Sequence, residues 1–309
     1  MRSEDESRKR WAIILAGGEG KRLSALTQRI SGDDRPKQFC SLIGNSSLIE
    51  QTRRRVCLSI PDDHILAVVT RTHEKYYVPL LRDMRRQNLI IQPENRGTGA
   101  AILHSMLRLV RLSKMASTGC VALFPSDHFV SDDRQFMRHV DLAFDAVALC
   151  PELTVLLGIS ADSPESGYGW IEPNQRLNAG AEIFSVRRFW EKPNAAVATE
   201  LLARGCLWNS FVIVARLSTL LGLLMVTVTD LYRAFAAVHL MLTGSSGEQK
   251  IKKLYRSIES IDFSQKVLAA RPMNLAVLPV RGCRWSDLGE PKRVISLMRE
   301  IGNHAGLAD

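Results

Sequence analysis

The chain of 309 residues is 46% hydrophobic and 24% charged, and its formal net charge is +9 at pH 7. This length can bury a substantial core, and the ordinary composition excludes a disordered or low-complexity chain. A net positive charge suits either nucleic-acid binding or the attraction of small anionic substrates. Because the sequence has no nucleic-acid-binding motif and no long block of Lys and Arg, we expect small anionic substrates and no nucleic-acid partner.

Features of membrane and secreted proteins are absent from the sequence pattern. Residues 1–10 form a mixed-charge tail without the apolar segment of a secretory signal. The longest apolar stretch, 217–228, is too short to cross a bilayer and predicts a buried core helix. Six cysteines lack a CxxC pair and zinc spacing, which indicates reduced thiols: Cys40, Cys57, Cys120, Cys150, Cys206 and Cys283. We therefore predict a cytoplasmic protein with no membrane partner.

Apolar periodicity predicts that strands alternate with helices through the first half of the chain. We expect strands at 11–17, 64–70, 88–93, 120–130 and 153–159, and helices at 46–60, 73–87, 98–113 and 133–149. The strands are apolar throughout, which is typical of a parallel sheet that helices cover on both faces. The predicted fold is therefore α/β, with a Rossmann-like, mostly parallel sheet flanked by helices.

The pattern changes after residue 160. Shorter β-like pieces occur at 167–173 and 181–193, and a helix-rich stretch follows from 215 to about 270. We interpret the pieces as a mixed substrate-binding portion added to the sheet. The predicted organisation is a tail at 1–10, an α/β core at 11–225, and a helix-rich portion at 226–309 that packs on the core and completes the active site.

A glycine-rich turn, LAGGEGKRL (15–23), follows the first strand. Gly18 and Gly20 match a dinucleotide-binding fingerprint, but Leu23 stands at the third glycine position and no acidic residue ends the second strand. A P-loop needs Ser or Thr after its Gly-Lys pair, where this chain has Arg22. Successive backbone N–H groups beside an arginine instead indicate a site for a phosphate.

Together with RPKQF (35–39), this string resembles the signature of the sugar-1-phosphate nucleotidyltransferases, and PKQF most resembles the mannose-1-phosphate guanylyltransferases. Six further segments resemble the same family in the same order: QPENRGTGAAI (92–102), FPSDHFV (124–130), GYGWIEP (167–173), FWEKP (189–193), LWNSFV (207–212) and WSDLG (285–289). Seven segments in order, spanning residues 12 to 289, make this resemblance specific.

The resemblance implies a set of nucleotide-binding residues. Gly17, Gly18 and Gly20 would let the backbone approach the triphosphate of GTP, and Arg22 and Lys37 would stabilise its charge. Base and ribose contacts would come from the next segment, at Asn95, Arg96, Thr98 and Gly99. Which of these atoms recognises guanine stays open.

The resemblance further implies that Asp127 and Asp287 bind Mg²⁺, so that both count as catalytic together with Arg22 and Lys37. A lone Asp at a strand end more often caps the chain, and it is the pairing of two carboxylates that favours a metal site. We expect His128 to be structural and Lys21 to be a solvated neighbour, since Lys21 stands at a variable position of the signature.

On the sugar side, the resemblance implies that Glu172 and Asn209 hydrogen-bond the hydroxyls, with Gly169 close to the ring. Lys192 would bind the phosphate of the sugar phosphate. Glu191 either orients Lys192 or contacts the sugar, and the sequence leaves both roles open.

The implied reaction is transfer of GMP from GTP to mannose 1-phosphate, without a covalent intermediate. Another nucleotide or hexose and a non-catalytic regulatory relative remain alternatives, whereas a dehydrogenase is disfavoured by the incomplete fingerprint. The chain shows no isomerase-type or hexapeptide-repeat domain up to Asp309, so we expect transferase activity alone, and the resemblance suggests a homodimer. Three departures from the family pattern stand out: a long 23–36 loop whose SGDDR resembles a mobile charged lid, Trp190, and Phe211 at a position where glycine is common.

Overall fold

The computed structural model describes residues 10–113, 119–240 and 247–300, so most of the predicted tail 1–10 lies outside the described residues. Arg10 already belongs to the first strand. Its guanidinium lies between Asp141 and Asp145, at 2.8 Å from each carboxylate, and over the ring of Phe144. The first strand therefore begins at a charged residue that a helix neutralises.

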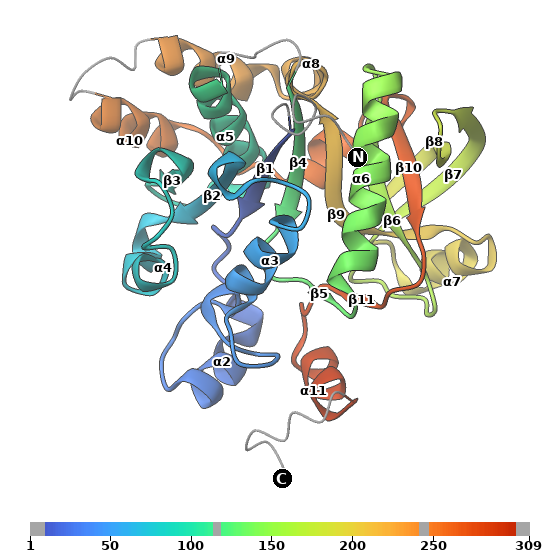
Figure 1. Ribbon diagram of the computed structural model, residues 1–309, viewed down its shortest axis with the longest axis horizontal. Coiled ribbons are helices and arrows are strands. Elements are labelled where there is room, and N and C mark those ends of the chain that lie inside the picture. Colours follow the sequence, from blue (N-terminus) through green and yellow to red (C-terminus); the bar gives the residue numbers. More distant parts are fainter. Residues whose placement is uncertain (1–9, 114–118, 241–246, 301–309) are drawn as a thin grey trace.

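A nine-stranded sheet forms the centre of the molecule (Figure 1). Its strands are β1 (Arg10–Leu15), β2 (Ile65–Thr70), β3 (Leu89–Gln92), β4 (Cys120–Pro125), β6 (Thr154–Ser160), β7 (Gly169–Asn178), β8 (Glu182–Glu191), β9 (Leu207–Arg216) and β10 (Leu275–Val280). They are arranged in the order β3-β2-β1-β4-β9-β6-β10-β8-β7. A separate antiparallel pair joins β5 (Phe129–Val130) to β11 (Trp285–Ser286).

The predicted α/β fold and the parallel half of its sheet are confirmed. β3, β2, β1 and β4 are parallel neighbours, as expected for apolar runs buried on both faces. Beyond β4 the sheet is mixed. β9 lies antiparallel between β4 and β6, and β10 is parallel to β6 but antiparallel to β8. The complete sheet is therefore mixed rather than mostly parallel.

Two strands of the sheet lie where no strand is expected from the sequence. β9 includes LWNSFV (207–212), which the sequence marks only as a family-like segment, and β10 belongs to the portion 226–309, which is predicted to be helix-rich. β10 is a short apolar run and β9 is a ten-residue run of mostly buried residues; neither alternates, because a central strand is buried on both faces. The portion 226–309 therefore supplies a strand inside the sheet as well as helices against it.

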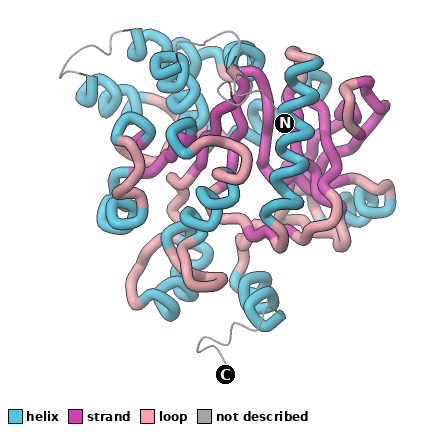
Figure 2. Tube along the Cα trace, in the orientation of Figure 1, coloured by secondary structure: helices cyan, strands magenta, loops and turns pink. Residues whose placement is uncertain are grey.

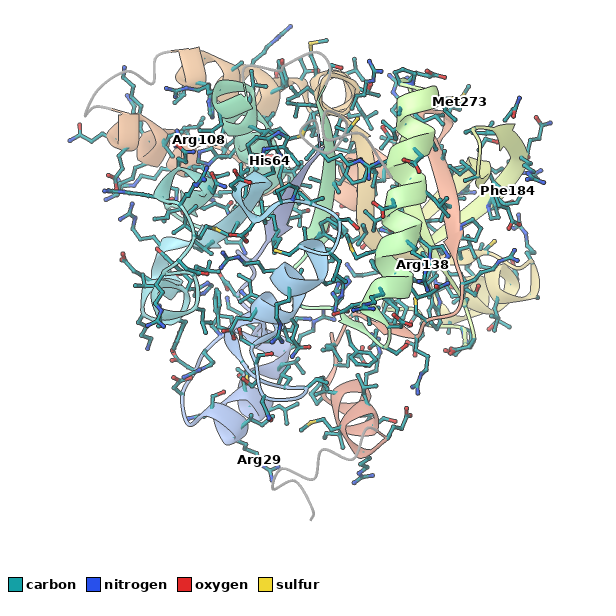
Figure 3. All side chains as sticks on the ribbon, in the orientation of Figure 1. Arg29, His64, Arg108, Arg138, Phe184 and Met273 are labelled. Atoms are coloured by element: carbon teal, nitrogen blue, oxygen red, sulfur yellow. The ribbon has the colours of Figure 1, made fainter. Side chains whose placement is uncertain are left out.

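Helices cover both faces of the sheet (Figure 2). Their bounds are α2 (Ser24–Ser31), α3 (Leu48–Val56), α4 (Glu74–Leu80), α5 (Gly97–Ser113), α6 (Asp133–Leu149), α7 (Ala195–Ala203), α8 (Leu217–Thr227), α9 (Thr229–Leu240), α10 (Gly247–Ser257) and α11 (Pro291–Glu300). α3, α4, α6 and α7 share one buried apolar cluster with the sheet, and α5, α8, α9 and α10 share another. Side chains fill the space between these layers (Figure 3).

The apolar stretch 217–228 forms α8, which buries Leu217, Leu220 and Leu224 in the second cluster, so the prediction of a core helix is confirmed. Within the described ranges, no helix combines the length and the apolar character needed to cross a bilayer. All six cysteines are described and carry free thiols, as the sequence predicts.

A third, smaller apolar cluster lies outside the two main layers. It joins Leu23 and Leu26, at the start of α2, to Val294, Leu297 and Met298 of α11. α2 and α11 lie together at one end of the molecule (Figure 1). The loop 23–36 is thus partly helical, and its SGDDR segment is held by Arg35, which pairs with Asp33 at 2.7 Å and lies over the ring of Tyr76. The mobility of this charged segment stays a prediction.

Candidate active site

A cavity of about 450 Å³ opens at the carboxyl ends of β1 and β4. Each of the seven family-like segments contributes to its wall. Twelve of the predicted site residues line it: Gly17, Gly18, Arg22, Lys37, Asn95, Thr98, Asp127, Gly169, Glu191, Lys192, Asn209 and Asp287. Gly20, Arg96, Gly99 and Glu172 are not among the lining residues. In α/β folds ligands collect at this end of the strands, so the cavity is the candidate active site.

The glycines of the first turn have two different roles. A Cβ on Gly17 would lie 2.5 Å from Nε2 of Gln92, and one on Gly20, whose φ is +64°, would lie 3.0 Å from the backbone N of Lys37. These two glycines let neighbouring chain segments pack closely. Gly18 is exposed and has no heavy atom within 4 Å of such a Cβ, so its backbone is open to a ligand.

Arg22 and Lys21 follow this turn in a single 3-10 turn, Lys21–Leu23. Arg22 is exposed, lines the cavity and has no ion-pair partner among the residues that the structure describes. Lys21 does not line the cavity: its side chain is 83% exposed and its ammonium lies 2.5 Å from Glu19. Arg22 is thus the cation of the pair that an anion in the cavity can reach.

Lys37 connects the two loops that carry the predicted metal ligands. Its Nζ lies 3.1 Å from Oδ2 of Asp127 and donates hydrogen bonds to the carbonyl oxygens of Asp287, at 2.9 Å, and Leu288, at 3.0 Å. The Lys37 side chain is 12% exposed. Leu288 is fully buried with a φ of +47°, a left-handed backbone conformation that costs a residue other than glycine about 1–2 kcal/mol. One buried ammonium therefore brings both aspartate loops together.

The groups around Asp127 stabilise its ionised form. Burial raises the pKa of this carboxyl, but the Lys37 ammonium, His128 and a backbone hydrogen bond together outweigh burial, and the net pKa is lowered. Burial lowers the pKa of the neighbouring His128 to about 4, against the opposing effect of Asp127. The His128 ring packs edge-on against Trp285, with 5.0 Å between ring centroids. His128 is therefore neutral at neutral pH and packs as a structural residue.

Asp287 is neutralised by a different cation. Its Oδ1 accepts hydrogen bonds from the backbone N–H of Gly289, at 2.8 Å, and from Arg293 in α11, at 2.5 Å. The described residues contain no group of three or more His, Cys, Asp or Glu side chains that could hold a metal ion. Asp127 and Asp287 thus offer two carboxylates on one cavity, and further ligands would have to come from substrate or water.

The predicted nucleotide segment at 95–99 is bound to the chain portion that precedes β10. The Gly99 N–H donates to the carbonyl of Ile261 at 2.9 Å, and the Phe263 N–H donates to Oγ1 of Thr98 at 2.8 Å. The Arg96 side chain donates to the carbonyl of Tyr255 at 2.8 Å, which holds it out of the cavity. Arg96 and Gly99 therefore lie behind the wall, whereas Asn95 and Thr98 line the cavity.

Four of the five predicted sugar-side residues meet in one corner of the cavity. A Cβ on Gly169 would lie 3.2 Å from Oε2 of Glu191 and 3.3 Å from Cβ of Asn209, so these three residues are in close contact. The Lys192 ammonium lies 2.7 Å from Oε1 of Glu191. Glu191 therefore contacts both Lys192 and the Gly169 corner, and the two roles left open by the sequence are compatible.

Glu172 lies on the other face of β7. Along this strand Gly169 and Ile171 face one side and Trp170 and Glu172 the other, as strand geometry requires. The Glu172 carboxylate is buried and paired with Arg204, and it lies 3.7 Å from Arg187. This placement does not support the predicted contact of Glu172 with a sugar hydroxyl, and it gives the residue a structural partner instead.

Several lining residues lie outside the sequence-based prediction. Gln38 donates to the carbonyls of Ala16, at 3.0 Å, and Gly18, at 2.7 Å, and so shapes the glycine turn. Other polar residues of the wall outside the prediction are Gln92, Ser126, Tyr168, Ser260, Asp262 and Ser264. Gln38 and Gln92 belong to the family-like segments, so the sequence could have indicated them as site residues. The stretch 260–264 belongs to no such segment, and nothing in its sequence indicates a site.

Comparison with known proteins identifies the family of the chain. Residues 11–304 match the sequence profile described as nucleotidyl transferase. The chain belongs to the nucleotidyl transferase family. Alginate biosynthesis protein AlgA of Pseudomonas putida is 31% identical over 287 residues, covering 90% of this chain and 56% of the relative. A mannose-1-phosphate guanylyltransferase of Salmonella montevideo is 27% identical, covering 90% of this chain and 57% of the relative.

A crystal structure described as mannose-1-phosphate geranyltransferase from Thermus thermophilus resembles this nucleotidyl transferase fold with a TM-score of 0.78. The two are 26% identical, and the match covers 93% of this chain and 79% of that one. This nucleotidyl transferase chain spans about half the length of the curated relatives it matches.

Proposed function

We propose that the protein transfers GMP from GTP to α-D-mannose 1-phosphate and forms GDP-mannose and pyrophosphate. The observation that carries this proposal is the Lys37 junction, where one ammonium contacts Asp127 and the carbonyls of Asp287 and Leu288 beside the glycine turn. Guanine and mannose are favoured by the relatives named mannose-1-phosphate guanylyltransferase and by the PKQF string.

We further propose Mg²⁺ as the cofactor, held by Asp127 and Asp287. Two carboxylates on one cavity fit this ion, which keeps several waters and takes its remaining ligands from substrate phosphates. When bound, Mg²⁺ would neutralise charge on the phosphates during transfer.

On the nucleotide side, the protein would act through charge and position. A phosphate oxygen of mannose 1-phosphate attacks the α-phosphorus of GTP, the bond from that phosphorus to the bridging oxygen breaks, and pyrophosphate leaves with the electron pair. The attacking phosphate needs no general base, since the second pKa of a phosphomonoester is about 6. Arg22, which is exposed and lacks an ion-pair partner in the described ranges, would hold the departing pyrophosphate, and Lys37 would stabilise the same charge.

On the sugar side, Lys192 would hold the phosphate of mannose 1-phosphate, while Glu191 and Asn209 would bind the hydroxyls beside Gly169. Lys192 has a φ of +46° and its side chain is 53% exposed. Backbone strain at a cavity residue is typical of functional positions. The ammonium can leave Glu191 for a substrate phosphate without losing buried contacts.

The test is pyrophosphate release from every pair of four nucleoside triphosphates with mannose 1-phosphate, glucose 1-phosphate and galactose 1-phosphate. We expect GTP with mannose 1-phosphate to give the highest kcat/KM, and EDTA to abolish it. A higher value for another pair would replace the proposed substrates but keep the chemistry. No turnover with any pair would instead indicate a non-catalytic regulatory relative. Sedimentation of the same sample tests the expected homodimer.

A further inference from the structure

The Asp287 carboxylate uses its two oxygens differently. Oδ1 is occupied by two donors, the Gly289 N–H and the Arg293 guanidinium. Oδ2 accepts no hydrogen bond from the described residues, and a Cβ on Gly289 would lie 2.6 Å from it. One oxygen is therefore held by the protein, and the other stays available to a ligand in the cavity.

Arg293 is itself held from several sides. Its guanidinium lies over the ring of Tyr168, with 4.4 Å from Cζ to the ring centroid. Its Nη2 lies 3.3 Å from Glu165 and 3.4 Å from Glu290, and the side chain is 16% exposed. A guanidinium fixed by two carboxylates and an aromatic ring has little freedom to follow Asp287, so Arg293 can define the position of that carboxylate.

The helix that carries Arg293 is anchored to the nucleotide side of the site. Val294 and Leu297 of α11 are buried in the third apolar cluster with Leu23 and Leu26. Leu23 directly follows Arg22, the cation expected on the triphosphate. α11 therefore connects the position of Arg293 to the turn on which Arg22 sits.

We propose that Arg293 is a positioning residue that holds Oδ1 of Asp287 so that Oδ2 points to a divalent cation. The proposal rests on the proposed function, because it assumes that Asp287 is a metal ligand. Arg293 lies outside the seven segments that carry the family resemblance. The opposing possibility is that the guanidinium competes with the cation for the carboxylate, and the two roles predict opposite effects of removing it.

The test is titration of the purified protein with Mn²⁺ alone, with free Mn²⁺ read from its EPR signal. Partners that orient a metal ligand typically contribute about 10–100-fold to metal affinity, so Arg293→Met should weaken Mn²⁺ binding by about tenfold or more. Arg293→Lys should give an intermediate affinity, since an ammonium can still donate one hydrogen bond to Oδ1. Lys292→Ala removes an exposed positive charge from the same helix and should bind like wild type.

The Asp287→Asn variant tests whether Asp287 binds the metal, independently of the role proposed for Arg293. If Asp287→Asn binds Mn²⁺ as tightly as wild type, the metal assignment fails, and the role of Arg293 fails with it. If Asp287→Asn loses binding while Arg293→Met binds as tightly as wild type or more tightly, the positioning role alone is overturned. Circular dichroism checks that each variant is folded; should Arg293→Met not fold, an unchanged affinity of Arg293→Lys overturns the proposal.

Discussion

Replacing Lys37 by Met removes the ammonium that joins the two aspartate loops while keeping a side chain of similar length. The Asp127 carboxylate then loses a partner at 3.1 Å, and the carbonyls of Asp287 and Leu288 lose their donor. We expect a loss of both stability and turnover, because the same ammonium holds the loops and faces the cavity.

The magnitude follows from burial. Removing one partner of a buried ion pair costs about 3–5 kcal/mol, whereas exposed pairs contribute about 0–1 kcal/mol. The Lys37 and Asp127 side chains are 12% and 24% exposed, near the buried end of this range. We therefore expect Lys37→Met to lower the free energy of unfolding by about 3 kcal/mol. Loss of this positive charge beside the charge that develops on pyrophosphate should lower kcat by about 10²–10³-fold.

The assays are urea unfolding followed by circular dichroism and pyrophosphate release under saturating substrates. Lys21→Met is the matched control, because Lys21 is 83% exposed and pairs with Glu19 at the surface. Its effect on unfolding should stay within about 0.5 kcal/mol. If Lys37→Met unfolds like this control and keeps its kcat within a few-fold of wild type, the junction does not have the role we assign to it.

Three further predictions use other parts of the molecule. Lys192→Ala should raise KM for the sugar phosphate far more than KM for GTP, and equal effects would reject the division between the two sides. Gly97→Ala should lower the free energy of unfolding by about 2 kcal/mol or more, measured in urea, because φ is +79° and a Cβ would lie 2.4 Å from the carbonyl O of Ile261. Gly44→Ala is the matched control, because φ is +70° but the space around a Cβ is open, and it should lower the free energy of unfolding by about 1 kcal/mol. Burial, with a smaller effect of Arg111 and Arg108, lowers the pKa of His239 to about 4, so this residue destabilises the fold as the pH falls below the unfolded pKa of about 6.5. When the pH is lowered from 7 to 5, the free energy of unfolding should therefore fall by about 2 kcal/mol less in His239→Leu than in wild type. An equal fall in both proteins would contradict this.

The first half of the fold could be predicted from the sequence because its strands are continuous apolar runs separated by amphipathic helices. β9 and β10 could not, because a run buried on both faces has no period that distinguishes a strand from a helix. The register of β9 between β4 and β6 also depends on pairing between segments far apart in the chain.

The candidate site could likewise be predicted only in part from the sequence. Residues inside family-like strings, such as Lys37 and Asp127, meet at one cavity as expected. Glu172 shows the limit of a string match, because strand alternation, and not the string, decides which face of β7 it occupies. The stretch 260–264 reaches the cavity, and Arg293 reaches the Asp287 carboxylate, through tertiary packing, for which the local sequence carries no signal.

The most direct test of the proposed chemistry is turnover with GTP, Mg²⁺ and mannose 1-phosphate, measured for wild type and for Asp127→Ala. Wild type should release pyrophosphate and form GDP-mannose in equal amounts, and Asp127→Ala should lose this activity while it remains folded. Equal turnover by both proteins would show that the chemistry does not depend on the aspartate that Lys37 holds at the cavity.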